Sequence, residues 1–257
     1  GAPPVFNNAG LFRKSAGTGT TIFSNNVTFS GGNVEVLTGT LSLAGNATTT
    51  TGGNFTVAGG AVLDLTGGAT RTYVGNYTGT GAGAVRVGSG ILDIGAAGVT
   101  FNFPGNLFQW SAGMLRGPGV LTNTGTLNLT GSVTLNGLTL DNAGTVTWTG
   151  AGNLNAGNGA VINNLADGLF DAQNDASVVF VIGGVAPVFN NAGIFRKSGG
   201  AGTTTFGSNV TFSGGNVEVL TGTLNLAGGN TTTTGGDFTV ASGAVLDLTG
   251  GATRTYI

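Results

Sequence analysis

A long internal repeat limits the folds open to this chain more than any other feature. Residues 1–74 align with residues 184–257 at a constant offset of 183, and 60 of the 74 pairs are identical. Thr28–Leu41, for example, returns unchanged as Thr211–Leu224. Such a period indicates a tandem array. We therefore divide the chain into residues 1–183, one full repeat unit, and residues 184–257, the start of the next unit. Because both ends fall inside a repeat, we expect a segment of a longer protein or polymer.

Within the long repeat, short runs alternate apolar and polar residues, as in Val34-Glu35-Val36 and Leu63-Asp64-Leu65. Alternation with period two predicts half-buried β-strands. Gly-Gly, Thr-Gly and Asn-Gly pairs separate the runs and favour turns. We expect an inward-facing core that includes Phe29, Leu41, Leu43, Phe55, Val57, Leu63, Leu65, Leu127, Leu129, Val146 and Trp148.

One frame recurs along the chain: an apolar residue, then asparagine, glycine and a second apolar residue. Its copies start at Phe6, Leu121, Leu140, Ile162 and Phe189, and the last four are 19, 22 and 27 residues apart. A unit of about 19–27 residues with two or three short strands is one coil of a solenoid, which buries its apolar side chains by stacking on its neighbours. We predict an all-β fold, a parallel β-solenoid with eight or nine coils per 183 residues. An antiparallel sandwich is the alternative, but the regular repetition disfavours it.

Composition excludes several function classes. The chain has no histidine and no cysteine, so it lacks the parts of a Ser-His-Asp triad, a thiolate metal site or a disulfide. Charged residues make up 7% of it and the net charge is −2, which disfavours nucleic-acid binding. The longest apolar run, Val178–Phe189, is interrupted by glycine and proline and falls short of a membrane helix. We assign no catalytic, cofactor-binding or metal-ligating residue and expect no enzyme and no cofactor.

Two acidic patterns are candidate sites. Asp167, Asp171 and Asp175 follow one another at four-residue spacing, and Ca²⁺ prefers several oxygen ligands; a polar loop is the favoured interpretation, and the sequence leaves calcium binding open. Asp64 with Arg71, repeated as Asp247 with Arg254, resembles the acid and base of a polysaccharide lyase, but we favour a surface ion pair. The same interpretation applies to Glu35 and Glu218.

Basic, aromatic and threonine residues offer weaker candidates. The pairs Arg13-Lys14 and Arg196-Lys197 suit an acidic polysaccharide or a neighbouring filament, although a solvated strand face is favoured. Tyr73, Tyr77, Trp110, Trp148 and Tyr256 are able to stack on sugar rings, but Trp148 alternates with Val146 and is expected in the core. A threonine array for ice binding is disfavoured, since residues 151–202 contain no threonine.

Two segments carry a family resemblance. The pattern AGxFRKSxGxGTTxF (Ala9–Phe23, again at Ala192–Phe206) and FDAQNDAS (Phe170–Ser177) resemble repeats of large secreted bacterial β-helical proteins, the haemagglutinin-like and autotransporter-passenger-like adhesins and fibres. The resemblance covers essentially the whole chain and is compositional. It implies a right-handed parallel β-helix, an extracellular or cell-surface location and a role in adhesion or in a biofilm matrix.

These observations lead to a first hypothesis, a structural filament or adhesin segment that assembles by coil stacking. Its partners would be further copies of the same repeat or a surface polysaccharide. A β-helical domain that binds or cleaves polysaccharides is the alternative. Clustered carboxylates in a groove would favour the enzyme, and exposed coplanar aromatic rings would favour a glycan-binding module.

Overall fold

The computed structural model of the chain describes residues 4–24, 27–45, 49–228, 231–233, 236–250 and 253–256. Its residues form two compact units, Gly1–Asn128 and Leu129–Ile257. The described residues contain strands and turns but no helix. The chain is a β-solenoid of about 10 turns with about 22 residues per turn, which confirms the predicted fold class. The division into repeat units at residue 183 stays a prediction from the sequence.

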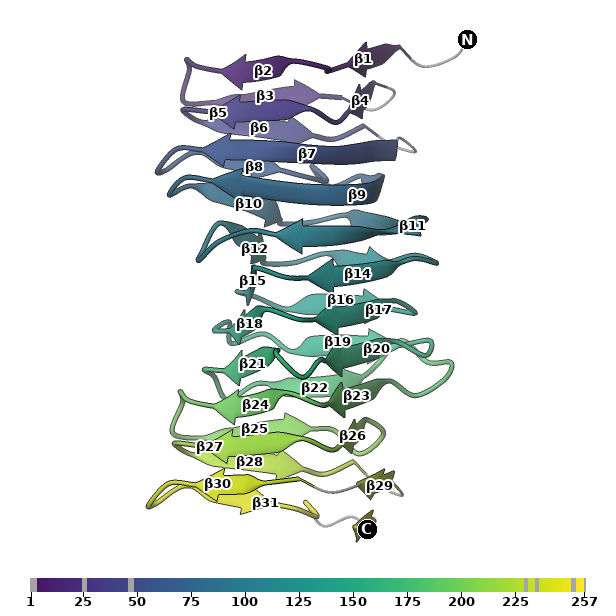
Figure 1. Cartoon of the computed structure of the whole chain (residues 1–257), viewed down its shortest axis with the longest axis vertical. Helices are drawn as coiled ribbons and strands as arrows, with labels where there is room; N and C mark the ends of the chain where they lie inside the picture. The colour runs from purple at the N-terminus through teal and green to yellow at the C-terminus, as the bar shows by residue number, and fades with distance from the viewer. Residues whose placement is uncertain are drawn as a thin grey trace. The chain divides into compact units, whose positions relative to one another are not determined.

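Unit 1 contains short strands joined by tight turns (Figure 1). The strands are β1 (Val5–Asn7), β2 (Leu11–Lys14), β3 (Thr20–Phe23), β4 (Thr28–Ser30), β5 (Asn33–Val36), β6 (Thr40–Leu43), β7 (Thr49–Val57), β8 (Val62–Asp64), β9 (Thr70–Thr80), β10 (Ala84–Val87), β11 (Ile91–Asn102), β12 (Phe108–Trp110), β13 (Met114–Arg116) and β14 (Val120–Asn123). β15 (Thr126–Leu129) includes the boundary between the units.

Unit 2 repeats this pattern. Its strands are β16 (Val133–Asn136), β17 (Thr139–Asn142), β18 (Thr145–Trp148), β19 (Leu154–Gly157), β20 (Val161–Asn164), β21 (Leu169–Ala172), β22 (Ser177–Phe180), β23 (Val188–Asn191), β24 (Ile194–Lys197), β25 (Thr203–Phe206), β26 (Thr211–Ser213), β27 (Asn216–Val219), β28 (Thr223–Leu226), β29 (Thr231–Thr233), β30 (Phe238–Val240), β31 (Val245–Asp247) and β32 (Arg254–Tyr256).

Three strands complete one coil. At the start of unit 1, β1 pairs with β4, β2 with β5 and β3 with β6, all in parallel. In unit 2, β23, β24 and β25 pair in the same way with β26, β27 and β28. The long strands β7, β9 and β11 each turn a corner and supply two sides of a coil. Gly52 and Gly75 lie at two of these corners with positive φ, where a side chain would be strained.

The core follows the predicted alternation. All eleven residues that the sequence places inside are at most 1% exposed. Equivalent side chains stack from coil to coil: the rings of Phe170 and Phe195 lie 5.5 Å apart, and those of Phe189 and Phe212 lie 5.4 Å apart. Leu63 and Leu65 are buried, while the Asp64 carboxylate accepts hydrogen bonds from the turn amides of Thr66 and Gly67. The strand register predicted here is therefore correct.

Candidate functional site

The asparagine of the repeated frame forms a buried ladder along one corner of unit 2. Asn142 Nδ2 donates to Asn164 Oδ1 at 2.8 Å, and Asn164 Nδ2 donates to Asn191 Oδ1 at 2.7 Å. Each amide also donates to a backbone carbonyl of the next coil: Asn142 to Leu169 and Asn164 to Ile194. Amide ladders of this kind stabilise parallel in-register strands. The frame thus joins successive coils through side chains as well as backbone.

The glycine of the frame permits this close stacking. A Cβ atom on Gly193 would collide with the carbonyl oxygens of Leu165 and Gly168 on the preceding coil, and one on Gly168 would collide with the carbonyl of Asn142. These contacts are with backbone, which has little freedom to move. Asparagine and glycine therefore recur together because one binds the neighbouring coil and the other lets it approach.

Lys197 is fully buried at another corner of unit 2, at the end of β24. Its Nζ donates to Asn174 O at 2.8 Å, Gly199 O at 2.9 Å, Asp175 Oδ1 at 2.9 Å and Thr204 Oγ1 at 3.1 Å. The hydrogen bond from Lys197 lowers the pKa of Asp175. Buried ammonium groups require such partners because losing water is costly. The lysine holds two coils and two loops together, so its predicted place on a solvated strand face is wrong. The same prediction is wrong for Lys14, which is 8% exposed.

The arginines of the basic pairs do lie outside. Arg13 Nε donates to Glu35 Oε2 at 2.5 Å, and Arg196 Nε donates to Glu218 Oε2 at 2.6 Å. Each pair joins one coil to the next. The surface-pair interpretation of both glutamates is confirmed, and exposed pairs of this kind contribute little to stability.

The proposed pair of Asp64 with Arg71 is wrong. Arg71 is fully buried inside the solenoid and donates to the carbonyls of Gly45 and Phe29 and to Thr50 Oγ1. Asp64 Oδ2 lies 3.8 Å from Arg86 Nη2 instead. Arg71 shares a strand face with Tyr73, so the alternation of β9 directs it inward. The side chain of Arg254, its equivalent, lies outside the described residues.

The tyrosine and tryptophan side chains that the structure describes belong to the core and are not free to stack on sugar rings. Tyr73, Tyr77, Trp110 and Trp148 are all 0% exposed. Tyr73 Oη donates to Leu65 O and Tyr77 Oη to Thr50 O, and burial raises the pKa of Tyr73 to about 12. The core position predicted for Trp148 is confirmed. Tyr256 lies outside the described side chains.

The three aspartates of the candidate calcium loop do not converge. Asp171 accepts hydrogen bonds from Gln173 and Ser198, Asp175 pairs with Lys197, and Asp167 is exposed. Among the described residues, no three His, Cys, Asp or Glu side chains lie close enough to share a metal ion. The four-residue spacing spreads these carboxylates along one coil.

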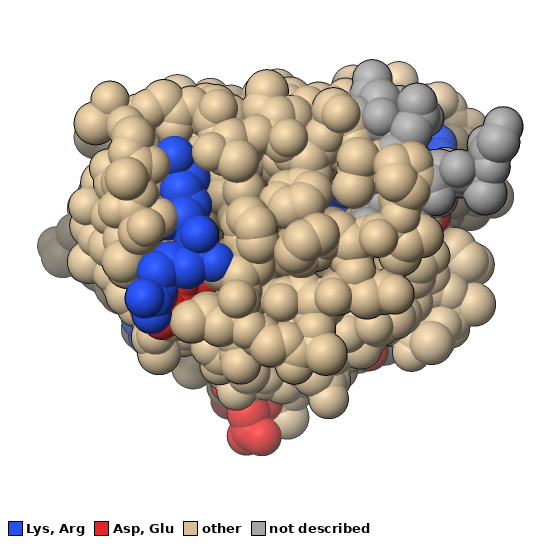
Figure 2. Space-filling view, turned by 90° about the horizontal axis from the view of Figure 1, so that it is seen from above, with Lys and Arg blue, Asp and Glu red and all other residues tan. Residues whose placement is uncertain are grey.

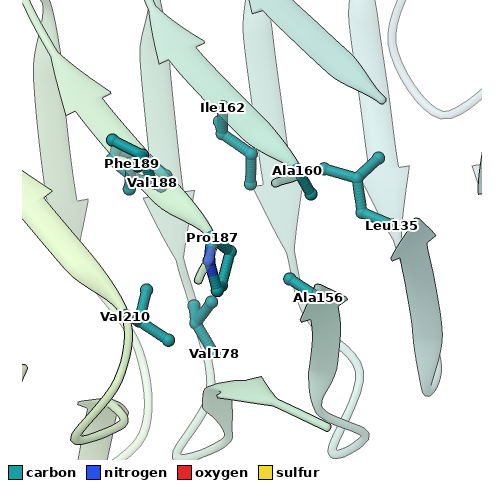
Figure 3. Close-up of a pocket in the computed structure, with 9 residues that line it drawn as sticks. All are labelled: Leu135, Ala156, Ala160, Ile162, Val178, Pro187, Val188, Phe189 and Val210. Carbon is teal, nitrogen blue, oxygen red and sulfur yellow. The ribbon is translucent and has the colours of Figure 1, made fainter. Parts of the chain in front are cut away.

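A small cavity in unit 2 is lined entirely by apolar side chains (Figure 3). Leu135, Ala156, Val178 and Phe189 point into it, and it encloses about 10 Å³. A water molecule needs about that volume and two or more polar partners. The cavity is therefore a packing defect of the core and has no room for a substrate.

Comparisons with known proteins give no family for this chain. No protein-family model matches it, and neither curated proteins nor solved structures give a match. In the described part of the chain, no helix is long and apolar enough to cross a membrane.

Proposed function

We propose that this chain is a structural segment of an extracellular filament or adhesin, and that it assembles by stacking β-solenoid coils. The observation that carries the proposal is the placement of exposed apolar side chains. Of 13 large hydrophobic residues that are exposed among the described side chains, seven belong to the first and last coils: Val5, Phe6, Leu11, Ile22, Phe238, Val240 and Val245. A strand at the edge of a sheet presents unpaired backbone groups, which readily pair with another chain.

The scarcity of charge supports the same proposal. Figure 2 looks onto the end where the N-terminus lies, and most of that face carries neither acidic nor basic residues. Net charge keeps proteins apart in solution, and this chain carries −2 over 257 residues. Little repulsion therefore opposes end-to-end association. The extracellular location rests on the family resemblance of the repeats, and antibody labelling of intact against permeabilised cells tests it.

Fibre diffraction and electron microscopy of the concentrated chain test the assembly. We expect a reflection near ~4.8 Å along the fibre axis, the spacing of hydrogen-bonded strands. A weaker axial repeat equal to the length of one chain is also expected, because chains that stack end to end repeat every 257 residues.

Charged substitutions on the end coils supply the control for this test. Phe6→Lys combined with Val245→Lys should prevent fibres, because each ammonium would have to be desolvated on stacking. Val181→Lys changes an exposed apolar residue between β22 and β23 and should leave fibres intact. A chain that stays monomeric at high concentration contradicts the proposal. So does turnover of pectin or alginate that disappears in Asp64→Asn.

A further inference from the structure

The internal repeat places one sequence in two environments. Residues 5–23 form the first coil of unit 1, and their equivalents, residues 188–206, lie inside unit 2, where β20 pairs with β23, β21 with β24 and β22 with β25. In unit 2 this sequence is thus covered by the coil of residues 161–180. Differences between the two copies show what the uncovered copy lacks.

Apolar packing is the first difference. Phe6 is 40% exposed, whereas its equivalent Phe189 is 1% exposed and packs against Phe170, with ring centroids 5.1 Å apart. Phe23 is half-buried, whereas Phe206 is fully buried. The sequence of the first coil therefore has a defined hydrophobic partner, which the coil of residues 161–180 supplies in unit 2.

The lysine corner is the second difference. Lys14 Nζ donates to the carbonyls of Ala16 and Gly17, both in its own loop. Lys197 has the matching bond to Gly199 and two further acceptors on the preceding coil, Asn174 O and Asp175 Oδ1. The Lys14 corner is thus an incomplete copy of the Lys197 corner.

Backbone fit is the third difference. A Cβ atom on Gly10 would meet nothing within 4 Å, whereas one on its equivalent Gly193 would collide with the preceding coil. The amides of Gly193 and Ile194 donate to Asn164 O and Gly168 O on that coil. Gly10 is equivalent to Gly193, and Leu11 is equivalent to the similar Ile194. The first coil therefore retains the shape that accepts a neighbouring coil.

We propose that the first coil, residues 5–23, is a docking surface for a coil with the sequence of residues 161–180 from another copy of the repeat. This proposal rests on the proposed function and names the partner for one end of the stack. The docked asparagine and aspartate would complete the Lys14 corner as Asn174 and Asp175 complete that of Lys197. The docked coil would also bring the asparagine equivalent to Asn164 against Asn8, as Asn164 donates to Asn191 in unit 2.

The test extends the full chain by one coil. A copy of residues 160–183 is fused ahead of Gly1, which keeps the 183-residue period, and the two lysines of the chain are labelled with an amine reagent and separated by mass spectrometry. In the unextended chain Lys14 should react faster than Lys197. The extension should slow Lys14 by about tenfold or more, towards the rate of Lys197, because a buried amine reacts only after local opening.

A matched extension carries alanine at the positions equivalent to Asn174 and Asp175, and it should protect Lys14 less. Gly10→Ala gives a second measurement: it should leave the melting temperature of the unextended chain nearly unchanged and lower that of the extended chain. An unchanged ratio of Lys14 to Lys197 labelling, together with tolerance of Gly10→Ala in the extended chain, overturns the docking proposal. Protection of Lys14 without fibres supports docking and counts against the filament. Fibres together with a fully reactive Lys14 in the extended chain support the filament and count against docking.

Discussion

At the scale of single residues, a buried ammonium group holds the corner around β24 and β25. Lys197 and Lys14 are equivalent in sequence, but Lys197 has four acceptors and Lys14 has two. Lys197→Met should destabilise the surrounding coils by about 2–4 kcal/mol, because buried acceptors lose their donor. Lys14 is also buried, at 8% exposed, but both of its acceptors lie in an exposed loop that water reaches, so Lys14→Met should cost about 1 kcal/mol. Hydrogen exchange over residues 174–204 and 11–21 measures both, and equal costs would contradict the difference in burial.

The tyrosines give a prediction about alkaline pH. Burial raises the pKa of Tyr73 to about 12, and the pKa of Tyr77 is raised for the same reason. An unfolded tyrosine ionises near pH 10. Because the folded pKa is raised, the contribution of Tyr73 to stability is complete below ~pH 10. It is lost as pH rises through ~12, by up to about 3 kcal/mol.

Absorbance titration of a variant with Tyr77→Phe and Tyr256→Phe follows Tyr73 alone, because the chain has three tyrosines. The folded variant should show little tyrosinate at pH 10, and the same variant in denaturant should be half ionised there. Ionisation near pH 10 in both states would mean that Tyr73 is accessible to water.

At the scale of the strand, two adjacent asparagines on β20 separate the inner ladder from the outer surface. Asn164 is fully buried and bridges Asn142 and Asn191. Asn163 lies on the outer side and donates to Asp141. Asn164→Ala should cost about 2–3 kcal/mol, since it removes three hydrogen bonds in a buried site, and Asn163→Ala should cost less than about 1 kcal/mol. Hydrogen exchange of the β20 and β23 amides measures the difference, and similar costs would show that the ladder adds little.

The turn between β23 and β24 gives a second test at this scale. Gly193→Ala should strongly destabilise the coil, because its Cβ would collide with two carbonyl groups of the preceding coil, whereas Gly10→Ala should be tolerated in open space. Overpacking of this kind typically costs ~1–3 kcal/mol. Thermal unfolding of the two variants gives the comparison. A tolerated Gly193→Ala would mean that the coils separate easily.

The alternation of the strands indicates the buried positions of Lys14 and Arg71 correctly, whereas the usual preference of charged residues for the surface does not. Phe12 and Lys14 lie on one face of β2, and Arg71 and Tyr73 lie on one face of β9, so period two already directs both cations inward. Charged residues are seldom buried, and that general preference led to the wrong surface positions. Two of the four acceptors of Lys197, Asn174 O and Asp175 Oδ1, were beyond prediction, because they lie 23 and 22 residues earlier. Coil lengths of 19–27 residues leave the register between such distant positions open.

At the scale of the whole molecule, each coil contacts only its neighbours, so stability depends on what lies above and below it. A coil at an end of the chain loses one of two interfaces, whatever its sequence. The repeat makes this effect measurable, because residues 5–23 and 188–206 are nearly identical in sequence, and so are residues 55–65 and 238–248. Intrinsic exchange rates within each pair are therefore closely similar.

Native-state hydrogen exchange should show opposite asymmetries in the two pairs. Residues 188–206 should be better protected than residues 5–23, because Phe189 is covered and Phe6 is exposed. Residues 55–65 should be better protected than residues 238–248, since Phe55 is 1% exposed and Phe238 is 42% exposed. Local opening of end coils precedes global unfolding in such arrays. Equal protection within both pairs would mean that the sequence of a coil, and not its neighbours, determines its stability. Protection that favours the same copy in both pairs would instead indicate that one whole unit is less stable than the other.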